Sequence, residues 1–110
     1  MSDVALVRDV ARQVRLKLPT LFPVRIYFRH ESDMPRQWGG NEYGLCVVNS
    51  VGDCVASASI FIRIGTYCEM LDSVRHEYAH ALSWSLTEGG DHDHGAAWGL
   101  AMSQVMMACD

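Results

Sequence analysis

The sequence predicts an α+β fold with an N-terminal helix, a small three-stranded sheet and two C-terminal helices. Apolar residues recur at the three-and-four spacing of an amphipathic helix near the N-terminus and again in the C-terminal half. Between these regions, apolar and polar residues alternate as in half-buried strands. The chain has 110 residues, of which 49% are hydrophobic and 20% charged, so residues 1–110 are expected to form one domain around one core.

The N-terminal third predicts one helix followed by one strand. Apolar positions at helical spacing run from Val4 to Leu18, and Pro19 ends the helix because proline cannot continue its hydrogen-bonding pattern. Residues 24–29 alternate apolar and polar side chains and predict the first strand. Residues 30–41 contain one proline and two glycines without any period, so we expect a loop there.

Two further strands are expected in the middle of the chain. Residues 43–48 predict a short strand, residues 49–53 a turn and residues 54–64 a longer strand. We expect the three strands to form one sheet, with strand 54–64 at its edge, where an extended peptide could pair with it. One face of this strand is wholly apolar and consists of Ala58, Ile60, Ile62 and Ile64.

Two helices are predicted in the remaining part of the chain. Thr66 and Glu69 form a capping-box pattern that begins the second helix, and Gly89 and Gly90 end it. The third helix begins near His94 or Gly95 and runs nearly to the end of the chain. The side chains expected in the core are Leu71, Val74, Tyr78, Ala81 and Leu82 of the second helix, Ala97, Leu100, Ala101, Val105 and Ala108 of the third, and also Met70, Trp84, Met102, Met106 and Met107.

The composition excludes several classes of protein. The four cysteines form no CxxC pair, so we expect neither a zinc ribbon nor a disulfide framework, but free and mostly buried thiols. No apolar segment has the length of a transmembrane helix or the position of a signal-peptide core. We therefore expect a protein without a membrane partner in the bacterial cytoplasm, or in the host cytoplasm if a phage encodes it.

The net charge of −4 is unevenly distributed along the chain. All nine Lys and Arg residues lie at or before Arg75. In the C-terminal third, after this residue, every charged side chain is Asp or Glu. Arg8, Arg12 and Arg15 recur at helical spacing and could form a basic face for nucleic acid. A solvated helix face is the favoured interpretation because the overall balance is acidic, so nucleic acid stays an alternative partner. The sequence does not predict the oligomeric state.

His76, Glu77 and His80 form an HExxH motif in the middle of the second helix. Residues four apart on a helix lie one turn above each other on the same face, so both imidazoles can bind one metal ion. Glu77 would then lie beside the ion, where it can take a proton from a water molecule whose pKa zinc lowers from about 15.7 to near 7. The motif predicts a hydrolase site with one Zn²⁺, the ligands His76 and His80, and Glu77 as the general base.

A catalytic zinc usually has three protein ligands and one open position. After the two glycines that end the second helix, the chain offers His92 and His94. We choose His94 because it begins the third helix, where packing of Trp98 would fix its position, and His92 remains the alternative. Asp91 or Asp93 could orient a ligand through its second ring N–H, and Asp93 could equally cap the third helix.

The remaining polar aromatic residues have less defined roles. Tyr43, Tyr67 and Tyr78 could each donate a hydrogen bond to an oxyanion, although packing is expected for all three. The sequence does not choose among them. His30, at the end of the first strand, is expected at the surface.

The segments HEYAHALSW and DHDHGAAWGLAM resemble the SprT-like zinc metallopeptidase family with its small phage and bacterial members. The resemblance covers residues 66–107 and implies a minimal zincin-like fold with an HExxH active-site helix, one Zn²⁺ per chain and a protein or peptide substrate. The chain lacks the zinc ribbon and basic extensions of larger members, so cleavage of DNA-bound proteins is not implied. The matched residues are His76 and His80 as helix ligands, Glu77 as the general base, and His94, Gly95 and Trp98 as the downstream ligand motif.

Two functions are compatible with these observations. We predict a zinc-dependent metallopeptidase that hydrolyses peptide bonds with Glu77 as the general base. The alternative is a zinc-binding adaptor or interaction module without catalytic activity, with nucleic acid as one partner. Glu77 favours the enzyme, because a structural zinc needs no general base and is usually closed by four protein ligands. If both His92 and His94 bound the ion, the open position would disappear and the adaptor would be favoured.

Overall fold

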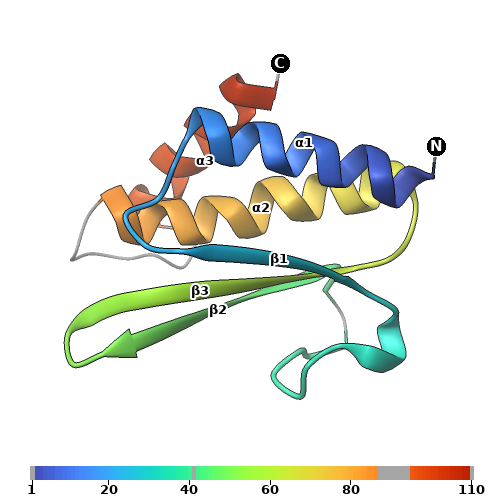
Figure 1. Cartoon of the computed structure of the whole chain (residues 1–110), viewed down its shortest axis with the longest axis horizontal. Helices are drawn as coiled ribbons and strands as arrows, with labels where there is room; N and C mark the ends of the chain where they lie inside the picture. Colours follow the sequence, from blue (N-terminus) through green and yellow to red (C-terminus); the bar gives the residue numbers. More distant parts are fainter. Residues whose placement is uncertain (1, 41, 87–94, 110) are drawn as a thin grey trace.

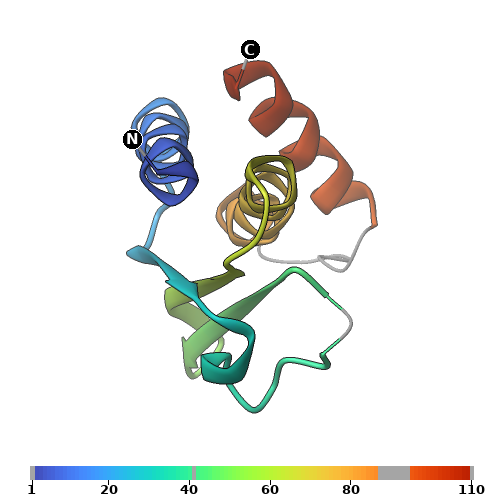
Figure 2. The same cartoon turned by 90° about the vertical axis from the view of Figure 1, so that its right-hand side faces the viewer.

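In the computed structural model, which describes residues 2–40, 42–86 and 95–109, three helices lie on one side of a small three-stranded sheet (Figures 1 and 2). The predicted α+β class is confirmed. The elements follow one another as α1 (Asp3–Lys17), β1 (Val24–Arg29), a short 3-10 helix η1 (Glu31–Asp33), β2 (Gly44–Val51), β3 (Cys54–Arg63), α2 (Tyr67–Leu86) and α3 (Ala96–Cys109).

Helix α1 begins one residue earlier than its apolar pattern predicts. The Ser2 side chain caps the helix by accepting a hydrogen bond from the backbone N–H of Ala5, over 3.2 Å. The face predicted from the spacing is the buried one, since Val7, Ala11 and Val14 are almost wholly covered. Burial of this apolar face, rather than helix propensity alone, holds a helix of this length.

The sheet has the strand order β1-β3-β2, with β1 parallel to β3 and β2 antiparallel to it. The prediction that residues 54–64 form an edge strand is therefore wrong, because β3 is central and β1 and β2 are the edges. Alternation does identify the inner face correctly, as Ile60 and Ile62 are fully buried beneath the helices. It cannot identify which neighbours pair with the strand, since β1 reaches β3 from a distant part of the sequence.

Strand β2 is longer than predicted and the turn after it is shorter. The strand continues to Val51, and Gly52 has the positive φ of 63° that a tight turn requires. A register shift between Asn49 and Ser50 accommodates these polar residues within the ladder. Asn49 also donates a side-chain hydrogen bond to Ser57 Oγ across the strands, over 3.2 Å. Residues that favour turns locally are thus held in a strand by tertiary pairing.

Helix α2 is the central element, and it contacts α1, α3, β2 and β3 (Figure 2). The predicted capping box is confirmed. Thr66 N–H donates to Glu69 Oε1 over 3.0 Å, and Glu69 N–H donates to Thr66 Oγ1 over 3.2 Å. Gly89 and Gly90, expected to end the helix, lie outside the described residues. Its fully or almost fully buried side chains include Met70, Val74, Tyr78, Ala79, Ala81 and Leu82.

Helix α3 is apolar on several sides, and its buried face is narrower than predicted. Ala101 and Val105 are fully buried against the core, whereas Leu100, Met106 and Met107 are exposed, which corrects their assignment to the core. When apolar residues occur around the whole helix, their spacing cannot identify the face that packs. Within the described residues, no helix combines the length and the apolarity needed to cross a membrane.

The thiols are less buried than the sequence suggested. Cys46 is partly buried, while Cys54 and Cys68 are exposed, and all three are free. Cys54 is the first residue of β3 and Cys68 lies in the first turn of α2, so both occupy ends of elements that face solvent.

Candidate metal centre

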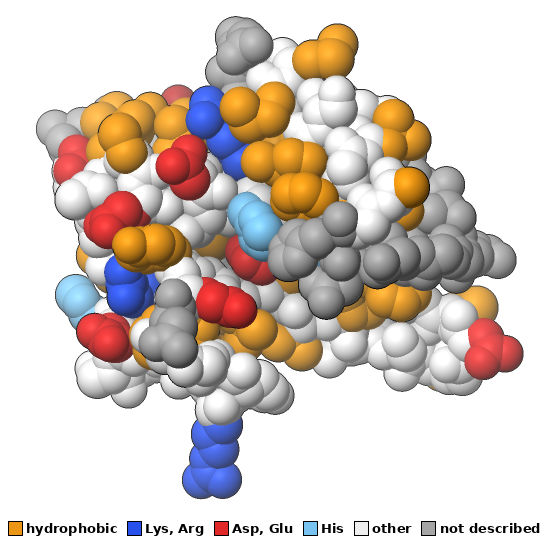
Figure 3. Space-filling model, turned by 180° about the vertical axis from the view of Figure 1, so that it is seen from behind, with side chains coloured by type: hydrophobic (Ala, Val, Ile, Leu, Met, Phe, Trp, Pro, Cys, Tyr) orange, Lys and Arg blue, Asp and Glu red, His pale blue; other side chains and the backbone are white. Residues whose placement is uncertain are grey.

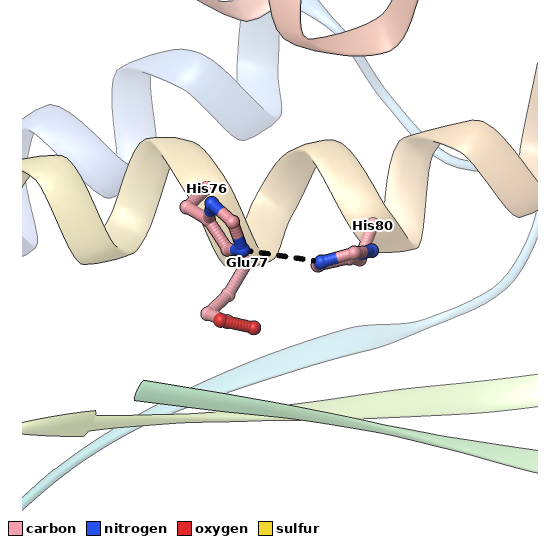
Figure 4. A group of neighbouring side chains, drawn as sticks. All are labelled: His76, Glu77 and His80. Atoms are coloured by element: carbon pink, nitrogen blue, oxygen red, sulfur yellow. Dashed lines mark hydrogen bonds between the residues drawn. The ribbon is translucent and has the colours of Figure 1, made fainter. Parts of the chain in front are cut away.

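His76 and His80 lie one turn apart on α2, with one nitrogen of each ring pointing toward the other and the ring planes 72° apart (Figure 4). Their Nε2 atoms are 3.2 Å apart. Two nitrogens that each bind one tetrahedral zinc ion at 2.0 to 2.1 Å would be separated by about 3.3 Å. The two nitrogens are within hydrogen-bonding distance of each other, and the same separation fits two ligands of a single ion.

Trp98 places the beginning of α3 beside the two histidines. Its ring centroid lies 5.2 Å from that of His76 and 5.8 Å from that of His80. Its indole N–H also donates to the backbone carbonyl of His76 over 3.4 Å. The indole thus limits the rotation of both imidazoles, and the packing role that the sequence suggested for Trp98 acts directly on the motif.

Glu77 points from α2 toward the strands and is only 7% exposed (Figure 4). The ligand atoms of His76, Glu77 and His80 lie within 4.8 Å of one another. No residue in the described part of the chain forms a hydrogen bond or an ion pair with the Glu77 carboxyl group. Burial, and then the nearby Glu42 carboxylate, raise the pKa of Glu77 from 4.5 to about 7.

Gly44 of β2 is the close neighbour that fits Glu77 against the sheet. A Cβ atom at this position would lie 3.1 Å from Glu77 Cγ and 3.1 Å from the backbone oxygen of Phe61. The next inward-facing residue, Cys46, is close enough that Glu77 contributes, after burial, to raising the pKa of its thiol to about 12. Cys46 is thus a neutral neighbour of the carboxyl group.

A pocket of about 380 Å³ opens beside His76 and Glu77. Such a volume is at the lower end of the range of small-ligand sites. Figure 3 shows a histidine at the surface with acidic side chains gathered near it. The lining residues are Glu42, Tyr43 and Gly44 before and at the start of β2, and Asp72, Ser73, His76 and Glu77 of α2.

Several of these pocket residues were missed by the sequence reasoning. Asp72 and Ser73 lie four residues before His76 and Glu77, so helical spacing could have identified them. Glu42 and Gly44 reach the site through strand pairing and packing, which no local pattern indicates.

The sequence did not choose among three tyrosines as hydrogen-bond donors to an oxyanion, and the structure places them in different surroundings. Tyr43 lines the pocket, whereas the Tyr78 hydroxyl donates to the carbonyl of Leu18 and Tyr67 packs against the core.

The predicted third ligand cannot be compared with this geometry. His94, its alternative His92, and the orienting candidates Asp91 and Asp93 lie outside the described residues. His94 therefore stays a prediction. His30 is exposed, as expected.

Arg8, Arg12 and Arg15 do share one side of α1, around a second pocket of about 390 Å³. Each guanidinium has a contact within the fold. That of Arg8 lies 5.4 Å from the centre of the Phe28 ring, Arg12 pairs with Asp9, and Arg15 donates to the carbonyl of Val24. Of the residues that the structure describes, none lines both this pocket and the one beside His76.

Comparisons with protein-family models, with curated proteins and with solved structures found no match to this chain. Its functional interpretation therefore depends on the chemistry of the site.

Proposed function

We propose that this chain is a zinc-dependent metallopeptidase with a zincin-like, SprT-like site. The observation that carries the proposal is the 3.2 Å separation of the His76 and His80 Nε2 atoms. It agrees with the separation of about 3.3 Å expected for two nitrogen ligands of one tetrahedral zinc. A separation above about 4.2 Å, twice the zinc–nitrogen bond length, would have excluded a shared ion.

The donor set fits zinc. Imidazole nitrogens are common zinc ligands, and the two of His76 and His80 are held by a helix and by the Trp98 ring. His94 is the third ligand that we propose, and His92 is its alternative. A bound zinc ion would supply Lewis acidity at a peptide carbonyl and would lower the pKa of water.

Glu77 is the residue that we propose to move the proton. It follows His76 directly, its carboxyl group points into the pocket, and no described residue occupies its oxygens. It can therefore take a proton from the attacking water and return it to the leaving amine. Its contact with Gly44 holds the carboxyl group at the side of the pocket that faces the strands.

The free edge of β2 is where we propose that an extended peptide binds. In the described part of the sheet, β2 pairs on one side with β3 and begins beside the pocket at Gly44. Main-chain pairing along an exposed strand is a general way to hold an extended peptide. This edge replaces β3, the edge expected from the sequence.

The test compares the untagged protein with Glu77→Gln and His80→Ala variants. Zinc content is measured by elemental mass spectrometry, and hydrolysis is measured on an unfolded protein substrate. We expect about one zinc per chain in the native protein and in Glu77→Gln. The native protein should hydrolyse the substrate, Glu77→Gln should not, and His80→Ala should lose both zinc and hydrolysis. His30→Ala, at an exposed histidine, is the matched control and should retain both properties.

Two results would contradict the proposal. Hydrolysis retained by a folded Glu77→Gln variant would exclude Glu77 as the base, and failure of the native protein to take up zinc would exclude the metal centre. His92→Ala and His94→Ala identify the third ligand. Zinc loss in both variants, without any hydrolysis by the native protein, would instead favour the adaptor.

A further inference from the structure

The charged residues described in the lining of the pocket beside the candidate metal centre are all acidic. Glu42, Asp72 and Glu77 contribute to its lining, and the lining residues that the structure describes include neither Lys nor Arg. Asp72 is 79% exposed at the rim and faces Arg75 at 3.7 Å, a loose surface pair that leaves most of its field unbalanced. The guanidinium of Arg63 lies 4.4 Å from the centre of the Tyr43 ring, but Arg63 is not among the lining residues.

Two polar side chains deep in this pocket are free to accept a ligand. Ser73 is 6% exposed and Glu77 is 7% exposed, so each is more than nine-tenths buried and faces the pocket. Within the described ranges, neither side chain has a hydrogen-bond partner or an ion-pair partner. Buried polar groups are normally hydrogen-bonded. The interior therefore favours a ligand that donates hydrogen bonds.

The shape of the pocket favours a long side chain with a charged end. Gly44 packs closely against Glu77, where a Cβ atom would lie 3.1 Å from Glu77 Cγ, so the backbone closes that side of the pocket. The partly exposed Tyr43 ring offers an apolar surface on the other part of the lining. Lys and Arg side chains combine methylene groups that pack on such a surface with a charged end that donates several hydrogen bonds. A neutral apolar side chain would leave Ser73 and the carboxylates unpaired.

We propose that this pocket is a subsite for a Lys or Arg side chain of the substrate, next to the peptide bond that is cleaved. The proposal rests on the proposed peptidase function and specifies its substrate class. The pocket adjoins His76 and Glu77 directly, so a side chain bound there belongs to a residue close to the reacting carbonyl. Glu42 and Asp72 are the residues that determine this specificity.

The experiment uses three peptides that differ at one position, which carries Lys, its neutral analogue norleucine, or Glu. Cleavage by the zinc-loaded full chain is compared as kcat/KM, and binding to the metal-free chain is measured by calorimetry. We expect the Lys peptide to be preferred over norleucine about tenfold or more in both measurements, with the Glu peptide the poorest. The preference should decrease with added salt.

The Glu42→Gln/Asp72→Asn double variant should bring the Lys-to-norleucine ratio close to one. The control is Asp9→Asn/Asp53→Asn, which makes the same change in net charge outside the pocket and should keep the ratio. Cleavage of all three peptides at similar rates would overturn the subsite and leave the peptidase intact. A binding preference without any cleavage would support the cationic subsite and overturn the peptidase. Equal binding without cleavage would overturn both.

Discussion

The buried carboxyl group of Glu77 should make the metal-free protein less stable above neutral pH than below it. The pKa of Glu77 is about 7 in the folded state, against 4.5 for an ordinary glutamate. The folded state thus binds this proton more tightly than the unfolded state does. Below pH 4.5 both states hold the proton and no penalty exists; the penalty grows as the pH rises from 4.5 and is complete above 7.

The magnitude follows from the difference between the two pKa values. About 2.5 pH units, each equivalent to about 1.4 kcal/mol, correspond to a penalty of about 3 kcal/mol at pH 8. At pH 5 the same relation leaves under about 1 kcal/mol. Glu77→Gln keeps the shape of the side chain and removes the charge. The variant should therefore be more stable than the native chain by about 3 kcal/mol at pH 8, although we expect it to be inactive.

Urea unfolding of both proteins at pH 5 and pH 8, with a chelator present, measures this difference. Comparing the two chains at each pH cancels the titration of the histidines, which they share. Glu69→Gln, on the same helix, is the matched control. Its carboxylate accepts hydrogen bonds from Thr66, which lower its pKa, so neutralising it should give no gain at pH 8. If Glu77→Gln raised the free energy of unfolding equally at both pH values, or not at all, the buried charge of Glu77 would not be the cause.

Three further predictions concern residues around the site. Trp98→Ala should weaken zinc binding about tenfold, measured by competition with a chromophoric chelator, because both imidazoles lose their packing partner. Leu100→Ala, on the exposed side of α3, is the control and should leave the zinc affinity unchanged. Equal zinc affinities of the native protein and both variants would contradict the role of Trp98. Gly44→Ala should reduce hydrolysis at least about tenfold and lower the free energy of unfolding by about 1 to 3 kcal/mol, because the added methyl lies 3.1 Å from Glu77 Cγ. Gly39→Ala, whose added methyl meets nothing within 4 Å, is the control. Full activity of Gly44→Ala would exclude the steric argument. Thr66→Ala should lower the free energy of unfolding by about 1 kcal/mol through loss of the capping box, and an unchanged unfolding midpoint would show that the cap contributes nothing.

The sequence predicted the elements well because each is determined by a local period. Alternation identified the inner face of β3, and the Thr66 and Glu69 pair located the beginning of α2 within one residue. The HExxH spacing likewise predicted that His76 and His80 share a face, since four residues make about one helical turn.

The errors concern relations between elements. Nothing in residues 54–64 indicates that β1 pairs with one side of β3 and β2 with the other. The apolar sequence of α3 has no preferred face, so its exposed side, with Met107 73% exposed, could not be predicted. The pocket residues before and at the start of β2 were missed because they belong to a different part of the chain from the motif. Glu42 and Gly44 approach Glu77 only once the sheet has packed beneath α2.

The candidate site lies beside an edge of the described sheet, at the start of β2. One side of α2 carries the apolar residues Val74 and Tyr78 that pack in the core, and another carries Ser73, His76 and Glu77. A polar stripe on a central helix must be satisfied by neighbouring groups or left accessible to a ligand. The described sheet ends at β2, beside this stripe. Under the proposed function, a peptide paired with the free edge of β2 would lie beside this stripe, with its scissile bond near His76, His80 and Glu77.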